Sequence, residues 1–134
     1  MRGLAPKALL TIGVAVSLAG CGAADPDAAS ETAERFYAAA QAEDGAGACG
    51  QLGEATREQL ERDEGEPCAE AVLGLRLTGG RATGTSAYMT EAKVDLDGGD
   101  SVFLEETGAG WRVTAAGCRP VSDQEAPYEC EVES

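Results

Sequence analysis

The hydrophobic period of this chain changes at Gly79 and Gly80, and no other feature constrains the fold more. Before the two glycines, apolar residues recur three and four positions apart, as Ala33, Phe36 and Tyr37 do, which is the pattern of one helix face. After them, apolar and polar residues alternate, which is typical of half-buried strands. Helices followed by strands predict an α+β fold, in which N-terminal helices pack against an antiparallel sheet of about four strands.

The helical half is expected to contain one long helix and three shorter ones. Ser30 is the expected N-cap of the long helix, because a serine hydroxyl accepts hydrogen bonds from the free N–H groups of a first turn. One shorter helix is expected to carry Cys49 and a second to cover residues 54–62. The third is expected to have Pro67 at its first position, where a missing N–H costs nothing.

The second half predicts a meander of antiparallel strands. The run Asp-Gly-Gly-Asp at positions 97–100 is typical of a hairpin turn. In the last strand, Trp111, Val113 and Ala115 alternate with polar or smaller residues, so we expect them to share one face. The expected strands are 81–88, 91–96, 101–107 and 111–116.

The N-terminal segment has the composition of an export signal. Arg2 and Lys7 are its only charged residues, and residues 8–20 are all apolar or small. A run of this length suits the hydrophobic region of a signal peptide, whereas a membrane-spanning helix needs about 20 apolar residues. We therefore expect a signal peptide over residues 1–20.

Leu18-Ala19-Gly20-Cys21 resembles the lipobox of bacterial lipoproteins at every position. The resemblance implies that the Cys21 thiol receives a diacylglyceryl group and that a peptidase cuts between Gly20 and Cys21. Two acyl chains anchor a protein stably, whereas a single chain gives marginal binding. We therefore expect a lipid-anchored protein on the extracytoplasmic face of the cell membrane. The alternatives are an ordinary secretory signal, or a buried cysteine that follows a hydrophobic helix.

The residues after Cys21 favour a short tether before the folded domain. Residues 22–29 lack bulky apolar side chains and include Asp25-Pro26-Asp27, which is typical of a flexible linker. The expected organisation is a signal peptide at 1–20, a lipidated cysteine and flexible tether at 21–29, and an α+β domain at 30–134.

Charge limits the partners of the mature chain. Without residues 1–20 it carries eight basic and 24 acidic residues, a formal charge of −16. So much negative charge repels phosphate backbones, which excludes nucleic acid as a partner. Solubility outside the cell explains this charge, and capture of cations or a basic partner is the sharper interpretation.

Several segments of residues 30–133 are informative when taken together: 36–40, 68–71, 103–104, 110–118 and the tail Pro127-Tyr128-Glu129-Cys130-Glu131. They resemble small actinobacterial lipoproteins of the NTF2-like superfamily, also described as cystatin-like or ketosteroid-isomerase-like. The resemblance implies a curved sheet around helices with a conical cavity, but no particular activity, because this fold hosts enzymes, binders and scaffolds.

Four cysteines remain once Cys21 is assigned to lipid. An even number in an exported chain predicts disulfides, and four cysteines allow three connectivities. We favour Cys49–Cys68, which would clamp the short helices, and Cys118–Cys130, which would pin the tail beyond the last strand. A zinc site is the alternative, although these spacings are wide for zinc and the chain has no histidine.

No catalytic set is recognisable in the sequence. The absence of histidine excludes Ser-His-Asp and Cys-His catalysis, and we expect neither a cofactor nor a metal. An isomerase-type site would need an acid and a tyrosine facing a dry pocket, and Tyr37 or Tyr88 with Asp95 or Glu91 could supply them. The expected pocket residues are Tyr37, Tyr88, Phe103 and Trp111.

The segment from Asp95 to Glu106 also invites comparison with a calcium loop. Glu106 stands at the twelfth position, but Asp100 occupies the sixth, where an EF-hand loop needs glycine, and the flanks are predicted strands. A solvated hairpin tip is therefore the favoured interpretation.

Two functional hypotheses follow. The first is a non-enzymatic, lipid-anchored extracytoplasmic module that binds a small molecule or an envelope protein. The alternative is a small cavity enzyme of the isomerase or dehydratase type, which only the superfamily resemblance motivates.

Overall fold

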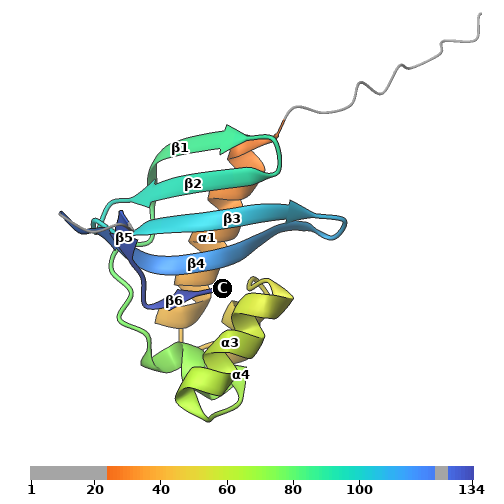
Figure 1. The fold of residues 1–134 in the computed structure, drawn as a ribbon, viewed down its shortest axis with the longest axis vertical. Helices are drawn as coiled ribbons and strands as arrows, with labels where there is room; N and C mark the ends of the chain where they lie inside the picture. The colour runs from red at the N-terminus through yellow and green to blue at the C-terminus, as the bar shows by residue number, and fades with distance from the viewer. Residues whose placement is uncertain (1–23, 123–126) are drawn as a thin grey trace, which may run out of the picture.

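The computed structural model describes residues 24–122 and 127–134. In it, helices are followed by an antiparallel sheet, so the α+β class predicted from the change of period is confirmed (Figure 1). The elements are α1 (Pro26–Gln41), α2 (Gly45–Cys49), α3 (Glu54–Glu64), α4 (Cys68–Ala71), the 3-10 turn η1 (Val72–Gly74), β1 (Ala82–Tyr88), β2 (Glu91–Leu96), β3 (Ser101–Thr107), β4 (Gly110–Pro120), β5 (Tyr128–Glu129) and β6 (Val132–Glu133).

The predicted signal peptide at 1–20 and the Leu18–Cys21 motif lie outside the described residues. Within the part of the chain that the structure describes, no helix has both the length and the apolar composition needed to cross a membrane.

The sheet has six strands rather than the expected four. Strands β1 to β4 form the predicted meander, and the C-terminal tail adds β5 and β6, which both pair with β4 (Figure 1). Each added strand is two residues long, which is too short to show an alternating pattern in the sequence. The tail thus belongs to the sheet and extends its β4 side.

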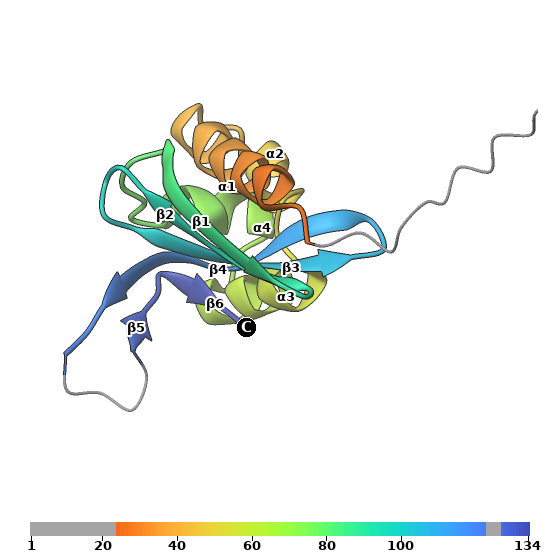
Figure 2. The same cartoon turned by 90° about the horizontal axis from the view of Figure 1, so that it is seen from above.

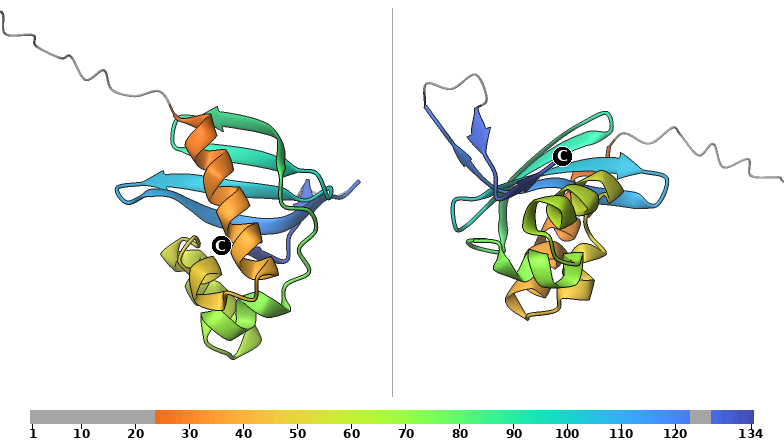
Figure 3. Two further views of the ribbon diagram at one scale, coloured as in Figure 1. Left: turned by 180° about the vertical axis from the view of Figure 1, so that it is seen from behind. Right: turned by 60° about the horizontal axis from the view of Figure 1, so that its bottom comes forward.

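Helix α1 lies across one face of the sheet, while the other face is free of helices along β1 to β3 (Figures 2 and 3). The core lies between α1 and the sheet, and the short helices α2 and α4 close it at the C-terminal end of α1. Its largest fully buried side chains are Tyr37, Phe36, Leu104, Val72, Val94, Val102 and Val113.

Helix α1 begins earlier than expected. Asp25, not Ser30, is the N-cap, and its carboxylate accepts hydrogen bonds from the N–H groups of Asp27 and Ala28 at 3.0 and 3.2 Å. An aspartate followed by proline combines a strong cap with a preformed first helical residue, so it outcompetes the later serine. Residues 26–29, expected in the tether, are therefore helical.

A β-bulge in β4 overturns the expected placement of Ala115. The register shifts at Thr114, so that Ala115 lies opposite Phe103 on the helix-free face. Ala116, expected on that face, instead points into the core and is fully buried. Because a bulge adds one unpaired residue, strict alternation from Trp111 onward gives the wrong face after it.

Two disulfides join the segments expected from the sequence. Cys49 pairs with Cys68 and ties α2 to α4, and their Cα atoms are 6.1 Å apart. Cys118 pairs with Cys130 and ties β4 to the tail between β5 and β6. The four cysteines are therefore cross-links rather than zinc ligands.

Candidate functional site

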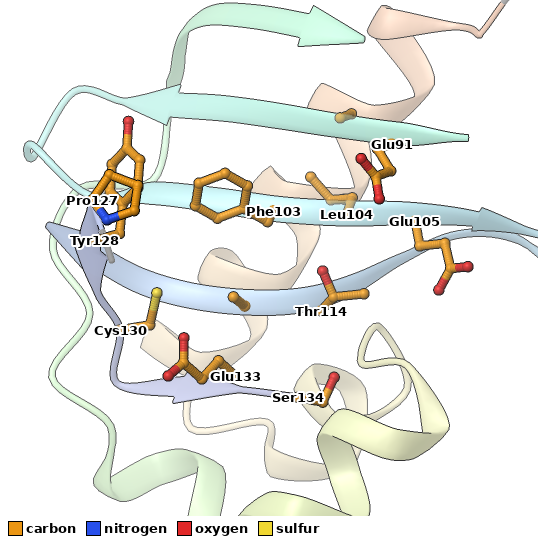
Figure 4. A pocket seen from close by; sticks show the side chains of 12 residues that line it. Glu91, Phe103, Leu104, Glu105, Thr114, Pro127, Tyr128, Cys130, Glu133 and Ser134 are labelled. Atoms are coloured by element: carbon orange, nitrogen blue, oxygen red, sulfur yellow. The ribbon is translucent and has the colours of Figure 1, made fainter. Parts of the chain in front are cut away.

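A groove of about 530 Å³ lies on the helix-free face of the sheet, between the strands and the C-terminal tail (Figure 4). Strands β2, β3 and β4 supply its floor, and the tail forms one wall. Its twelve lining residues are Glu91, Ala92, Phe103, Leu104, Glu105, Thr114, Ala115, Pro127, Tyr128, Cys130, Glu133 and Ser134.

An aromatic pair forms the apolar part of the groove. Phe103 projects from the middle of β3, and the β4 bulge places the small Ala115 beside it. The ring of Tyr128, from the tail, meets the Phe103 ring edge to face at a centroid distance of 5.1 Å. Both rings are half-buried, so they offer an apolar surface that solvent or a ligand can reach.

Carboxylates surround this apolar floor. Glu91 and Glu105 are direct cross-strand partners at one end of the groove, and Glu133 lies on the tail side (Figure 4). All three are exposed. Like charges directly opposite each other destabilise an antiparallel pair. Arg112, the partner of Glu105 on β4, offsets part of the repulsion, and a cation between Glu91 and Glu105 would relieve the rest.

The basic residue nearest the aromatic pair is already engaged. The Lys93 ammonium lies 2.9 Å from an Asp95 carboxylate oxygen and 5.4 Å from the centroid of the Tyr128 ring. Interaction with Tyr128 and then with Asp95 raises the pKa of Lys93. A hydrogen bond from the Ser101 hydroxyl, together with Lys93, lowers the pKa of Asp95. Lys93 is therefore committed to these neighbours and does not neutralise the glutamates.

The four expected pocket residues do not converge on one cavity. Only Phe103 lines the groove. Tyr37 and Trp111 belong to the core, and Trp111 is 4% exposed. Tyr88 lies at the end of β1 and is 78% exposed. The four side chains are separated because Tyr37 and Trp111 face the core, Phe103 faces the helix-free side and Tyr88 lies at a strand end.

A buried polar network surrounds Asp100, which is only 1% exposed. Its carboxylate accepts hydrogen bonds from the Tyr37 hydroxyl at 3.0 Å, the Thr78 N–H at 2.8 Å and the Thr78 hydroxyl at 2.7 Å. Arg119 adds an ion pair at 3.2 Å. The Gly117 N–H donates to the Tyr37 oxygen at 3.0 Å. Burial, followed by the nearby Asp100 charge, raises the pKa of Tyr37 well above its usual range, although the Gly117 bond opposes this.

This network contains the acid and tyrosine that an isomerase-type site would need, but with a different acid. Asp95 and Glu91, the expected acids, lie on the helix-free face, away from Tyr37. Asp100 receives four contacts from the protein itself, and neither it nor Tyr37 lines the groove. The pair therefore joins α1 to the sheet and leaves no acceptor free for a substrate.

The aspartates of the 95–106 segment point to different partners. Asp95 binds Ser101 and Lys93 on the helix-free face, while Asp97 accepts from the N–H groups of Gly80 and Arg81. These backbone bonds lower the pKa of Asp97. Together with the burial of Asp100, this geometry separates the carboxylates that a calcium loop would bring together.

The sequence does not reveal the roles of two residues. The pattern around Asp100 predicts a solvated hairpin tip, whereas the structure buries Asp100 against Tyr37, 63 residues away. Tyr128 belongs to a distinctive tail, but nothing in the tail alone indicates that it packs against Phe103. The one signal in the sequence is that Tyr128 lies two residues before Cys130, whose disulfide holds the tail against β4.

No family model, curated protein or solved structure matches this chain.

Proposed function

We propose that the mature chain is a lipid-anchored extracytoplasmic binding module that captures an organic cation with an apolar part. The lipobox resemblance of Leu18–Cys21 and the preceding apolar segment support the anchor and the location. The groove supports the binding role, and the single observation that carries it is an aromatic pair bordered by exposed glutamates.

The assignment to the NTF2-like superfamily belongs to this proposal. Helices followed by an antiparallel sheet, with α1 across one face, support it. The proposed ligand site, however, lies on the helix-free face and not in a cavity between helix and sheet. The tail that walls the groove is then an addition to the general architecture.

The chemistry of the groove selects the ligand class. Glu91 and Glu105 repel each other across the strand pair and favour an ammonium or guanidinium group between them. Phe103 and Tyr128 can pack against an alkyl or aromatic portion, and their faces also attract cations. An anion of the same shape would meet three carboxylates. The groove therefore discriminates by charge as well as by apolar contact.

The anchor is tested by the mass and partitioning of the exported protein. We expect the mature chain to begin at Cys21, to carry a diacylglyceryl group and to float with the membrane fraction. A Cys21→Ala variant should lose the acyl mass and leave the membrane. Membrane association of that variant as a processed, acylated protein would overturn the proposal.

The binding role is tested by titrating octyltrimethylammonium, below its micelle concentration, into the mature protein and following amide chemical shifts. Shifts should cluster on β3, β4 and the tail, and octyl sulfate should produce none of them. Glu105→Gln and Phe103→Ala should each weaken binding by about tenfold, which is about 1.4 kcal/mol. Glu64→Gln, an exposed glutamate at the end of α3, is the matched control and should bind as the wild type does. Equal binding of both detergents, or weakening by Glu64→Gln as well, would refute a charge-selective groove.

A further inference from the structure

The turn between β1 and β2 exposes two large apolar side chains in succession. Tyr88 is 78% exposed and Met89 is 71% exposed, and the only other large apolar residue exposed in the described chain is Leu73. Met89 has a φ of +55°, in the left-handed region that a residue with a long side chain adopts at a cost of about 1 kcal/mol or more. The turn thus presents a methionine where glycine or asparagine would be less strained.

This turn lies beside the start of α1. Strand β1 runs antiparallel to the helix, since the Thr85 hydroxyl meets that of Ser30 at 2.6 Å and the Ala82 N–H donates to Glu34 at 2.8 Å. The last residue of β1 therefore lies level with the first turn of α1. Figures 1 and 3 show the end of β1 next to the N-terminal end of α1 from opposite sides.

Covalent geometry limits how far this end of the domain can stand from the lipid. Ala24 follows Cys21 by three residues, and three fully extended residues span at most about 11 Å. Because α1 begins at Pro26, the longer tether expected from the sequence is not present. The headgroup region is about 5–7 Å deep on each side of the hydrocarbon core, so a lipid on Cys21 would hold the start of α1 close to it.

We propose that the Tyr88–Met89 turn inserts into the interfacial layer of the bilayer that holds Cys21 and so fixes the orientation of the domain. This inference rests on the proposed lipid anchor. Tyrosine suits the membrane interface, because its ring is apolar and its hydroxyl can remain in water. The flexible methionine side chain fits among disordered chains. Exposed acids at this end, Asp25, Asp27 and Glu91, favour a zwitterionic surface over an anionic one.

The orientation places the groove usefully. Glu91 pairs with Tyr88 across the turn and also lines the groove, so one end of the groove is next to the membrane. Pro127 and Tyr128 line the other end, near the start of β3 (Figure 4). A docked domain would therefore offer the groove sideways to ligands that move along the membrane surface.

The test uses the acylated mature protein in phosphatidylcholine vesicles with brominated acyl chains, which quench nearby tryptophan. In a Tyr88→Trp variant we expect the added fluorescence to fall at least twofold. The matched control is Leu73→Trp, because Leu73 is also an exposed apolar residue but follows α4, at the opposite end of the molecule (Figure 1). Its fluorescence should match that in unbrominated vesicles. The buried Trp111 gives the same background in both variants.

The outcomes separate this inference from the anchor. An acylated Tyr88→Trp protein that floats with the vesicles but is not quenched overturns the docking alone. Equal quenching at positions 73 and 88 overturns a fixed orientation. A protein that mass spectrometry shows to be unacylated, and that does not float, overturns the anchor and the docking together.

Discussion

Replacing Tyr37 with phenylalanine removes a single oxygen that joins α1 to the sheet. The hydroxyl donates to Asp100 and accepts from the Gly117 N–H, and both partners stay buried after its removal. A hydrogen bond to a carboxylate contributes about 1.5–3 kcal/mol to stability, and a buried N–H left without an acceptor costs about 1–3 kcal/mol. We expect the free energy of unfolding to fall by about 3 kcal/mol at pH 7, which lowers Tm by about 10 °C.

The same substitution should change the pH dependence of stability. The pKa of Tyr37 is raised in the folded state from an ordinary value of 10.0, so its contribution is complete below pH 10 and is lost above it. At pH 11 the free energy of unfolding of the wild type should have fallen by about 1.4 kcal/mol through this group, whereas the phenylalanine variant has no such group to titrate. The difference between the two proteins should therefore shrink from about 3 to about 1.5 kcal/mol.

Urea unfolding, followed by circular dichroism with the disulfides intact, measures this difference at both pH values. Tyr88→Phe is the control, because that tyrosine is exposed and its loss should leave stability unchanged. Other groups that titrate near pH 10 contribute equally to wild type and variant, so they cancel. A loss below 0.5 kcal/mol at pH 7, or a difference that does not shrink at pH 11, would refute the role assigned to the Tyr37 hydroxyl.

Three further predictions concern the backbone and the cross-links. Replacing Cys118 and Cys130 with serine should lower the free energy of unfolding by about 3 kcal/mol, as expected for a short closed loop, and should abolish groove binding; unchanged binding would contradict the role of the tail as a wall. Gly117→Ala should destabilise the protein more than Gly65→Ala, although φ is positive at both positions (+64° and +69°). The reason is that only at Gly117 would the new methyl group meet a neighbour, the Glu131 side chain at 2.6 Å. Equal losses of Tm in a thermal melt would argue against this contact. Asp25→Ala should destabilise the protein by about 1 kcal/mol through loss of the N-cap, and Asp25→Ser should restore most of it, whereas an unchanged Tm in the alanine variant would contradict the assignment.

The parts of the fold that the sequence predicted depend on local patterns. Strands β2 and β3 were predicted with their observed bounds. In β2 buried residues alternate with less buried ones, which produces a clear period of two, and in β3 the buried Val102 and Leu104 flank the half-buried Phe103. The disulfide pairs were also expected, since each joins segments that the predicted helices and strands bring together.

The parts that were missed depend on distant contacts. Asp100 has the surroundings of a surface turn in the sequence, and only the packing of α1 on the sheet shows that it is buried against Tyr37. The β4 bulge changes the face of Ala115 without a recognisable signal at Thr114. Tyr88 is an aromatic residue of the kind expected in a core, but it is the last residue of β1 and its side chain is exposed.

The cross-link between Cys118 and Cys130 ties the existence of the groove to oxidation. The tail is otherwise held by the two short strands β5 and β6, by the buried side chain of Val132 and by ion pairs of Glu131 with Arg76 and Arg119. In a reducing cytosol these two thiols stay unbonded, so a newly made chain would lack the covalent link that holds the tail, and with it Tyr128, beside Phe103. The groove would then reach its final rigidity only after the chain enters an oxidising compartment.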